Sequence, residues 1–268
     1  NRGDIMLALL LFGSFFILVF LNVPIAVSLG ISTFLGLLVG DFPVSMFPAV
    51  MYSSIGKFAL LAIPFFILSG VIMEYAGISK RLVKFAQVCV GHTKSGLISV
   101  AVVVSCFFAA ISGSGPATVA ALGSILIPAM VEAGYDRGLS TALMSASGAI
   151  GIIIPPSIAF VVYASIADVS IGKLFSAGII PGLLIGAAYA LVAVYSSREN
   201  TNIIEQPKPN RREVWMAFKD AFWGLLSPII ILGGIYGSIF TPTEAAGIIV
   251  VYSLVVGVFI YKEINIKD

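Results

Sequence analysis

The sequence predicts an all-α polytopic membrane protein with inverted-repeat architecture, one re-entrant helical hairpin and an incomplete second repeat. Of its 268 residues, 59% are hydrophobic and only 10% are charged, with a mean hydropathy of +1.08, whereas soluble domains carry about 25% charged residues. The apolar residues form stretches long enough to cross a hydrocarbon core, which takes about 20 helical residues. Breaks rich in glycine and proline interrupt several of these stretches.

The apolar stretches define the predicted elements, and proline, glycine or charged residues mark their ends. One of these elements is a basic amphipathic helix, and such a helix, rich in lysine and arginine, is typical of a membrane interface. In chain order we expect helices near 5–21 and 24–39, a partly apolar segment over 40–57, a span over 58–76, a basic amphipathic helix over 79–91 capped by Ser79, a broken span over 139–165, a span near 174–196, a polar linker over 197–212, and apolar segments over 222–240 and 245–261.

The uncharged stretch 95–131 is predicted to be the re-entrant hairpin. Its middle reads Ser112-Gly113-Ser114-Gly115-Pro116, and glycine costs a helix about 1 kcal/mol and proline about 3 kcal/mol. The arms, near 97–111 and 117–130, are each short for a full crossing. We therefore place the tip of the hairpin at the Gly/Ser-rich segment.

Loop charges support the hairpin. Connector 79–94 holds four basic residues and no acid, and linker 198–212 holds four basic residues against two acids. Short basic loops remain in the cytoplasm. Two clear spans and the stretch 97–130 separate the two basic connectors, so both connectors lie on the same side of the membrane if 97–130 enters the membrane and returns to the side it came from. Two complete crossings by 97–130 would also leave the connectors on one side, although its arms are short for that. Segments 1–4, 40–57 and 166–173 are then expected outside.

The two ends of the chain share one pattern in opposite orientations. Residues 5–39 form helix, Asn-Val-Pro break and helix, and residues 222–261 form helix, Thr-Pro-Thr break and helix. This is the pattern of an inverted-topology repeat, and a counterpart of 58–196 would bring a complete protein to roughly 400 residues or more. The expected divisions are scaffold helices over 1–57, a span and basic connector over 58–94, the hairpin over 95–131, a broken helix and following span over 132–196, a cytoplasmic linker over 197–220, and the start of the second repeat over 221–268.

Two helix breaks are candidates for a transport site, because backbone groups left unpaired in a membrane need protein, water or ions to satisfy them. One is the hairpin tip and the other is Pro155-Pro156-Ser157 with the glycines before it. Backbone carbonyls at a broken helix coordinate Na⁺, and N–H groups with serine hydroxyls hold carboxylates. Packing alone is the alternative interpretation. The expected substrate-binding residues are Ser112 and Ser157, and the expected sodium-binding residues are Ser112, Gly113, Ser114, Gly151 and Pro155.

Other chemistry finds little support. A net charge of +2 does not indicate a nucleic-acid partner. Cys89 and Cys106 lack metal-site or disulfide-framework spacing. A membrane hydrolase is the rival class, but Ser114 has no G-x-S-x-G elbow and no membrane-embedded histidine base, so we do not expect an enzyme. Glu244 fits a capping box with Thr241, and a proton or ion site is the alternative.

The motifs resemble the large membrane (M) subunit of tripartite ATP-independent periplasmic (TRAP) transporters, in order over nearly the whole chain. An outside N-terminus would also suit the M portion of a fused QM protein, in which the small and large subunits form one chain. The segments that carry the resemblance are Pro64-Phe65-Phe66, Gly70-Val71-Ile72-Met73, Gly91-His92, Ser112-Gly113-Ser114, Ile127-Pro128-Ala129-Met130, Gly134-Tyr135-Asp136, Ile154-Pro155-Pro156-Ser157 and Thr241-Pro242-Thr243-Glu244-Ala245-Ala246.

The resemblance implies an elevator-type secondary transporter of the bacterial inner membrane, driven by a sodium gradient as a symporter. Its partners would be a small four-helix membrane subunit, a periplasmic substrate-binding protein, the lipid bilayer, and an organic acid such as sialic acid or a C4-dicarboxylate. The second hairpin and its broken helix are absent from this sequence, so we expect no transport by this chain alone. The alternatives are another ion-coupled elevator carboxylate transporter without a binding protein, or a channel.

Overall fold

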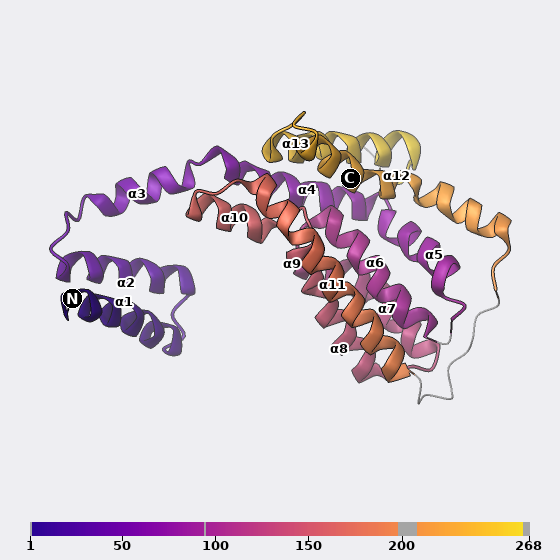
Figure 1. The fold of residues 1–268 in the computed structure, drawn as a ribbon, viewed down its shortest axis with the longest axis horizontal. Helices are drawn as coiled ribbons and strands as arrows, with labels where there is room; N and C mark the ends of the chain where they lie inside the picture. The colour runs from indigo at the N-terminus through magenta and orange to yellow at the C-terminus, as the bar shows by residue number, and fades with distance from the viewer. Residues whose placement is uncertain (1, 94, 198–207, 265–268) are drawn as a thin grey trace. The chain divides into compact units, whose positions relative to one another are not determined.

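The computed structural model describes residues 2–93, 95–197 and 208–264, all of them helical, turn or irregular. The chain separates into two compact units, residues 1–57 and 58–268. Six helices in the described part are long and apolar enough to cross a membrane, or seven if one bent pair counts as a span. The predicted all-helical polytopic architecture is therefore confirmed (Figure 1).

The first unit is a helical hairpin followed by a short helix. Helices α1 (Arg2–Phe20) and α2 (Ile25–Val39) pack along each other and confirm the two predicted helices. Leu11 of α1 lies against Gly36 of α2, where an added Cβ would be only 2.5 Å from the leucine side chain. Helix α3 (Met46–Ile55) has no buried residue and forms within the segment expected to be only partly apolar.

The second unit opens with a span and an amphipathic helix. The 3-10 turn η1 (Phe58–Leu61) leads into α4 (Ala62–Tyr75), confirming the span over 58–76, and α5 (Ile78–Val90) follows. The predicted cap Ser79 is wrong, because Gly77 precedes the helix in the left-handed conformation at φ 68°, which glycine adopts without steric cost. Ser79 lies inside the first turn, 2% exposed.

The apolar face of α5 contacts protein rather than a lipid surface. Ile78, Leu82, Val83 and Ala86 are at most 4% exposed, and α5 packs on the helices of residues Gly96–Ser112 (α6) and Arg211–Tyr236 (α12). The predicted amphipathic helix is thus confirmed, with its apolar face packed on protein, and the location of its charged face at a membrane interface stays a prediction. Burying the other face anchors the connector to the unit.

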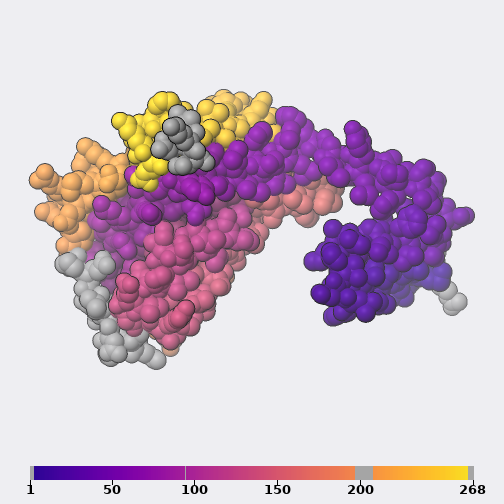
Figure 2. Space-filling model, turned by 180° about the vertical axis from the view of Figure 1, so that it is seen from behind, coloured from indigo at the N-terminus to yellow at the C-terminus, as the bar shows by residue number. Residues whose placement is uncertain are grey.

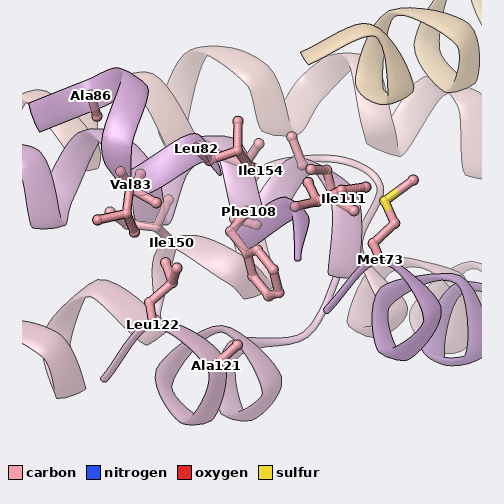
Figure 3. Packing of buried hydrophobic residues seen from close by; sticks show 14 of the residues in the cluster. Met73, Leu82, Val83, Ala86, Phe108, Ile111, Ala121, Leu122, Ile150 and Ile154 are labelled. Carbon is pink, nitrogen blue, oxygen red and sulfur yellow. The ribbon is translucent and has the colours of Figure 1, made fainter. Parts of the chain in front are cut away.

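Helices α6 (Gly96–Ser112) and α7 (Gly115–Glu132) lie side by side as a helical hairpin with its tip at the predicted position (Figure 1). Its re-entrant path stays a prediction. Thirteen of the 17 residues of α6 are buried, so this helix forms the centre of the unit. Figure 3 shows Phe108 and Ile111 of α6 among side chains from α4, α5, α7 and the broken helix. The expectation that both arms are short holds for α6, whereas α7, with 18 residues, is long enough to cross.

The chain after the hairpin forms the broken helix and a long span. Helices α8 (Arg137–Gly148), α9 (Ile150–Ile153) and α10 (Ile158–Ala167) follow one another. The α8–α9 segment and α10 bend by 42° at the Ile154–Ser157 break, where the Pro155–Pro156 peptide bond is cis. Helix α11 (Ile171–Ser197) confirms the next span. Residues 198–207 of the predicted linker lie outside the described residues.

Two helices complete the unit. Helix α12 (Arg211–Tyr236) begins 11 residues before the expected 222, where the Glu213 carboxylate accepts the Asn210 N–H, and Phe218 in its second turn packs on Phe85 of α5. Helix α13 (Pro242–Val255) continues as the π-helical turn η2 (Val256–Ile260). Helix α13 packs on α4, and Figure 2 shows the yellow C-terminal helix lying over violet helices of this unit.

Candidate ion and substrate site at two helix breaks

The hairpin tip ends one helix and starts the next within three residues. Gly113 follows α6 in the left-handed conformation, with φ 61°. Ser114 is extended and caps α7, since its hydroxyl accepts the Ala117 N–H at 3.4 Å. Pro116, which has no N–H to leave unpaired, sits in the first turn of α7. The Gly/Ser/Pro sequence thus dictates the tip predicted at this position.

The tip touches the second break directly. The Ile158 N–H donates to the carbonyl oxygen of Gly113 at 3.1 Å. A Cβ added to Gly113 would lie 2.7 Å from the carbonyl oxygen of Pro156, and one added to Gly151 would lie 3.0 Å from the Cα of Gly115. The two breaks are therefore held together by backbone contacts that only glycine permits.

Ser112 lies within a small hydroxyl network at the tip. It is 2% exposed, and its hydroxyl lies 3.2 Å from that of Thr118. Thr118 in turn donates to the carbonyl oxygen of Ser114 at 2.8 Å. Thr118 is not among the site residues predicted from the sequence, although a threonine in the first turns of a helix at a glycine-rich break is a usable signal.

Ser157 is the N-cap of α10 and is fully buried. Its hydroxyl accepts the Phe160 N–H at 3.3 Å and donates to the carbonyl oxygen of Ile152. A carboxylate bound here would compete with Ile152 for the hydroxyl proton and would face the N–H groups of the first turn of α10. An anion at such a helix start is favoured by both the N–H groups and the helix dipole.

Helix termini supply the electrostatics of this site. The segments around both breaks, residues 95–131 and 139–165, carry no charged residue. The C-terminal ends of α6 and α9 and the N-terminal ends of α7 and α10 belong to the two contacting breaks, and each helix end carries about half an elementary charge. Among the described residues there is no group of three or more His, Cys, Asp or Glu that could hold a metal ion. Carbonyl and hydroxyl oxygens, the ligands of a hard cation, are what the site offers.

Two neighbouring helices close over the breaks through glycines that the sequence analysis did not assign to the site. A Cβ on Gly70 of α4 would contact Ser112 at 3.4 Å. On α11, a Cβ on Gly178 would lie 2.7 Å from the carbonyl oxygen of Ile153, and one on Gly182 would lie 2.6 Å from the Ile154 side chain. Glycines inside otherwise apolar helices were the available signal for this close approach.

Glu244 forms the capping box predicted for the start of α13. Its carboxylate accepts the Thr241 N–H at 2.8 Å, and the Thr241 hydroxyl accepts the Glu244 N–H at 3.3 Å. The side chain belongs to neither of the two contacting breaks.

Comparison with known proteins agrees with the resemblance stated above. Residues 12–268 match the family model of the tripartite ATP-independent periplasmic transporter DctM component. The chain is 44% identical over 256 residues to the isethionate TRAP transporter permease protein DctMQ of Oleidesulfovibrio alaskensis, covering 95% of this chain and 40% of that protein.

Two other relatives cover similar shares of the chain. The C4-dicarboxylate TRAP transporter large permease protein DctM of Rhodobacter capsulatus is 38% identical over 98% of this chain and 63% of its own length. The sialic acid TRAP transporter permease protein SiaT of Haemophilus influenzae is 39% identical over 94% of this chain and 41% of its own length. The chain thus spans 40–63% of the length of these relatives.

The matched family and the candidate membrane spans confirm the prediction of a multi-pass protein of the bacterial inner membrane. Five of the eight motifs that carry the family pattern lie at the two contacting breaks, in α4 or at the α13 capping box, and the other three lie after α5, inside α7 and before α8. The chain belongs to the DctM family, the large permease component of tripartite ATP-independent periplasmic transporters.

Proposed function

We propose that this chain is part of the membrane subunit of a sodium-coupled secondary transporter that imports an organic acid delivered by a periplasmic binding protein. The observation that carries the proposal is the contact between two uncharged helix breaks, made by the Gly113–Ile158 hydrogen bond. Carbonyl oxygens of one break and N–H groups of the other offer a cation and an anion adjacent places.

Coupling follows from this adjacency. A carboxylate at Ser157 and the start of α10 adds negative charge beside carbonyl oxygens, which favours a cation there. A sodium ion bound first lowers the electrostatic cost of bringing a carboxylate into an apolar unit. By linkage, each ligand then raises the affinity for the other by the same factor, which is the requirement for symport.

The ligand set assigned to sodium consists of Ser112, Gly113, Ser114, Gly151 and Pro155. Gly113 already accepts one N–H, and a carbonyl oxygen has a second lone pair for a cation. Ser112 is assigned to both ligands, and its backbone carbonyl is the group assigned to sodium. The remaining ligands would come from the part of the longer relatives that this chain does not cover.

An acidic substrate is favoured by what the names of the three relatives share. Isethionate, C4-dicarboxylates and sialic acid are all anions at neutral pH. A periplasmic binding protein and a small membrane subunit, separate or fused, are proposed partners on the same family membership. A carrier without a binding protein and a passive channel are the competing functions.

The test is initial-rate uptake into proteoliposomes with the complete complex. Uptake should require an inward sodium gradient, saturate with substrate and depend on the binding protein. Ser157→Ala should weaken apparent substrate affinity by roughly tenfold, because a hydrogen bond to a charged group contributes about 1.5–3 kcal/mol.

The matched control is Ser124→Ala in α7, an exposed serine whose hydroxyl donates only to its own helix, to Ala121. It should leave the apparent affinity unchanged. Equal affinities in Ser157→Ala and wild type, with unchanged sodium dependence, would mean that the breaks serve packing. Uptake whose rate depends on neither the sodium gradient nor the proton gradient would identify a channel.

A further inference from the structure

A surface groove lies between α5 and the first turns of α12, and none of its lining residues belongs to the two contacting breaks. Its volume is about 300 Å³, and its lining consists of Phe85, Cys89, Arg211, Val214, Trp215 and Phe218. The Phe218 ring stacks on Trp215, with ring centroids 5.7 Å apart, and contacts Phe85 at 5.9 Å. The groove is therefore aromatic and apolar along its length, with one guanidinium.

The surroundings of the groove are strongly basic. Across α5, residues 208–210 and the first ten residues of α12, seven lysine and arginine residues stand against two acids, and one of the seven, Arg81, is paired with Glu263 at 2.6 Å. Both acids have partners: the Glu213 carboxylate accepts the Asn210 N–H at 3.0 Å, and Asp220 lies 4.0 Å from Lys84. Among the described residues Arg211 makes no ion pair. An anion is the ligand that this charge distribution attracts.

The position of the groove along α12 matches the surface of a membrane. The charged residues of this helix end at Asp220, and an apolar segment runs from Ala221 to Tyr236. Trp215, which is 57% exposed, stands one to two turns before that change, where tryptophan is enriched in membrane helices. The excess of lysine and arginine assigns this end to the cytoplasmic leaflet.

We propose that the groove binds one anionic phospholipid of the cytoplasmic leaflet. An acyl chain lies along Phe85, Val214 and Phe218, and the phosphate pairs with Arg211. A phospholipid combines an apolar chain with a negative headgroup, as the groove combines an apolar wall with a cation, whereas soluble phosphate would leave the wall uncovered. This site is independent of the transported substrate.

Protection of Cys89 tests the proposal, because this thiol lines the groove. The complete transporter is placed in nanodiscs of phosphatidylcholine with increasing fractions of phosphatidylglycerol, and maleimide labelling of Cys89 is followed by peptide mass spectrometry. Labelling should slow as the anionic lipid increases. In Arg211→Gln, the lipid fraction for half-protection should rise about fivefold, the effect of one basic residue at an anionic surface.

Arg212→Gln is the matched control, since Arg212 is adjacent in α12, exposed and absent from the groove lining. It should keep wild-type protection. Val214→Phe fills the groove while keeping every cation, so native mass spectrometry should find less phosphatidylglycerol retained by this variant.

Four results would each overturn the proposal. Equal protection by phosphatidylcholine alone would identify an unselective lipid surface, and equal shifts in Arg211→Gln and Arg212→Gln would identify a diffuse basic patch. Protection by soluble glycerophosphoglycerol would identify a soluble-phosphate site. Protection that needs the small membrane subunit would identify a protein interface.

Discussion

The hairpin tip, Ser112–Pro116, and the capping-box break, Thr241–Glu244, interrupt the helices in chemically different ways. At the capping-box break an exposed carboxylate accepts hydrogen bonds from the N–H and the hydroxyl of Thr241, within four residues. At the hairpin tip no residue is charged, Ser112 and Gly113 are buried, and the Gly113 carbonyl accepts the N–H of Ile158, 45 positions away. A break whose backbone groups are hydrogen-bonded by a side chain of the same break needs no further partner. A carbonyl that is paired with the N–H of a distant segment can instead exchange that N–H for a ligand.

The largest effect is expected from Gly113→Val. Valine would have to adopt φ 61° and place its Cβ 2.7 Å from the carbonyl oxygen of Pro156. The left-handed conformation costs roughly 1–2 kcal/mol outside glycine, and overpacking adds about 1–3 kcal/mol. We expect uptake by the complete complex to fall by more than about tenfold, with normal membrane insertion.

Gly233→Val is the control for this substitution. An added Cβ at Gly233, in α12, has no atom within 4 Å, and substitutions at such open positions usually stay within about 0.5 kcal/mol. Initial rates are measured at equal amounts of inserted protein. Similar losses in the two variants would mean that the tip contact has no special role.

A second large difference concerns which side of the membrane each break faces. If the hairpin is re-entrant, cysteines replacing Lys80 and Lys208 should be protected from an impermeant thiol reagent added outside. Cysteines replacing Asp168 and Ile239 should react, since one full crossing separates each from the basic side. All four positions are exposed. Reaction at only one of the two basic positions would contradict the hairpin.

The positions of the helix breaks were predictable from sequence, because glycine and proline determine the backbone conformation within a few residues. The tip at Ser112–Pro116, the break at Pro155–Pro156 and the Thr241–Glu244 capping box are all where the sequence placed them. Each depends on dihedral angles and hydrogen bonds within a few residues. The family membership followed from the same motifs.

Two failures concern local signals that were misread. The α5 cap was wrong because Gly77, two residues earlier, turns the chain, and the start of α12 was misplaced although the Glu213 carboxylate accepts the Asn210 N–H there, as in a capping box. The remaining failures have a non-local origin. The Gly113–Ile158 bond and the glycine contacts from α4 and α11 join distant segments. No local pattern encodes which segments meet, so these contacts had to be observed.

A smaller effect is expected from Ser112→Ala. Alanine keeps the backbone carbonyl that we assign to sodium and removes the hydroxyl, which lies 3.2 Å from that of Thr118 and 3.4 Å from the carbonyl oxygen and the N–H nitrogen of Ser114. A neutral hydrogen bond contributes about 0.5–1.5 kcal/mol, so apparent affinities should weaken by about threefold, less than in Ser157→Ala. Uptake is titrated with sodium and substrate separately. A loss larger than that of Ser157→Ala would assign the hydroxyl itself as a ligand.

The smallest effect is expected from Glu244→Gln, which separates a cap from an ion site. Glutamine serves in a capping box as glutamate does, so the unfolding midpoint and the sodium dependence of uptake should both stay unchanged. Glu213 provides the matched control, since its carboxylate accepts the Asn210 N–H at 3.0 Å at the start of α12, as Glu244 accepts that of Thr241. Glu213→Gln should therefore behave identically. Loss of sodium-driven uptake in Glu244→Gln but not in Glu213→Gln would show that the capping-box break also binds the coupling ion. The proposed difference between this break and the hairpin tip would then be wrong.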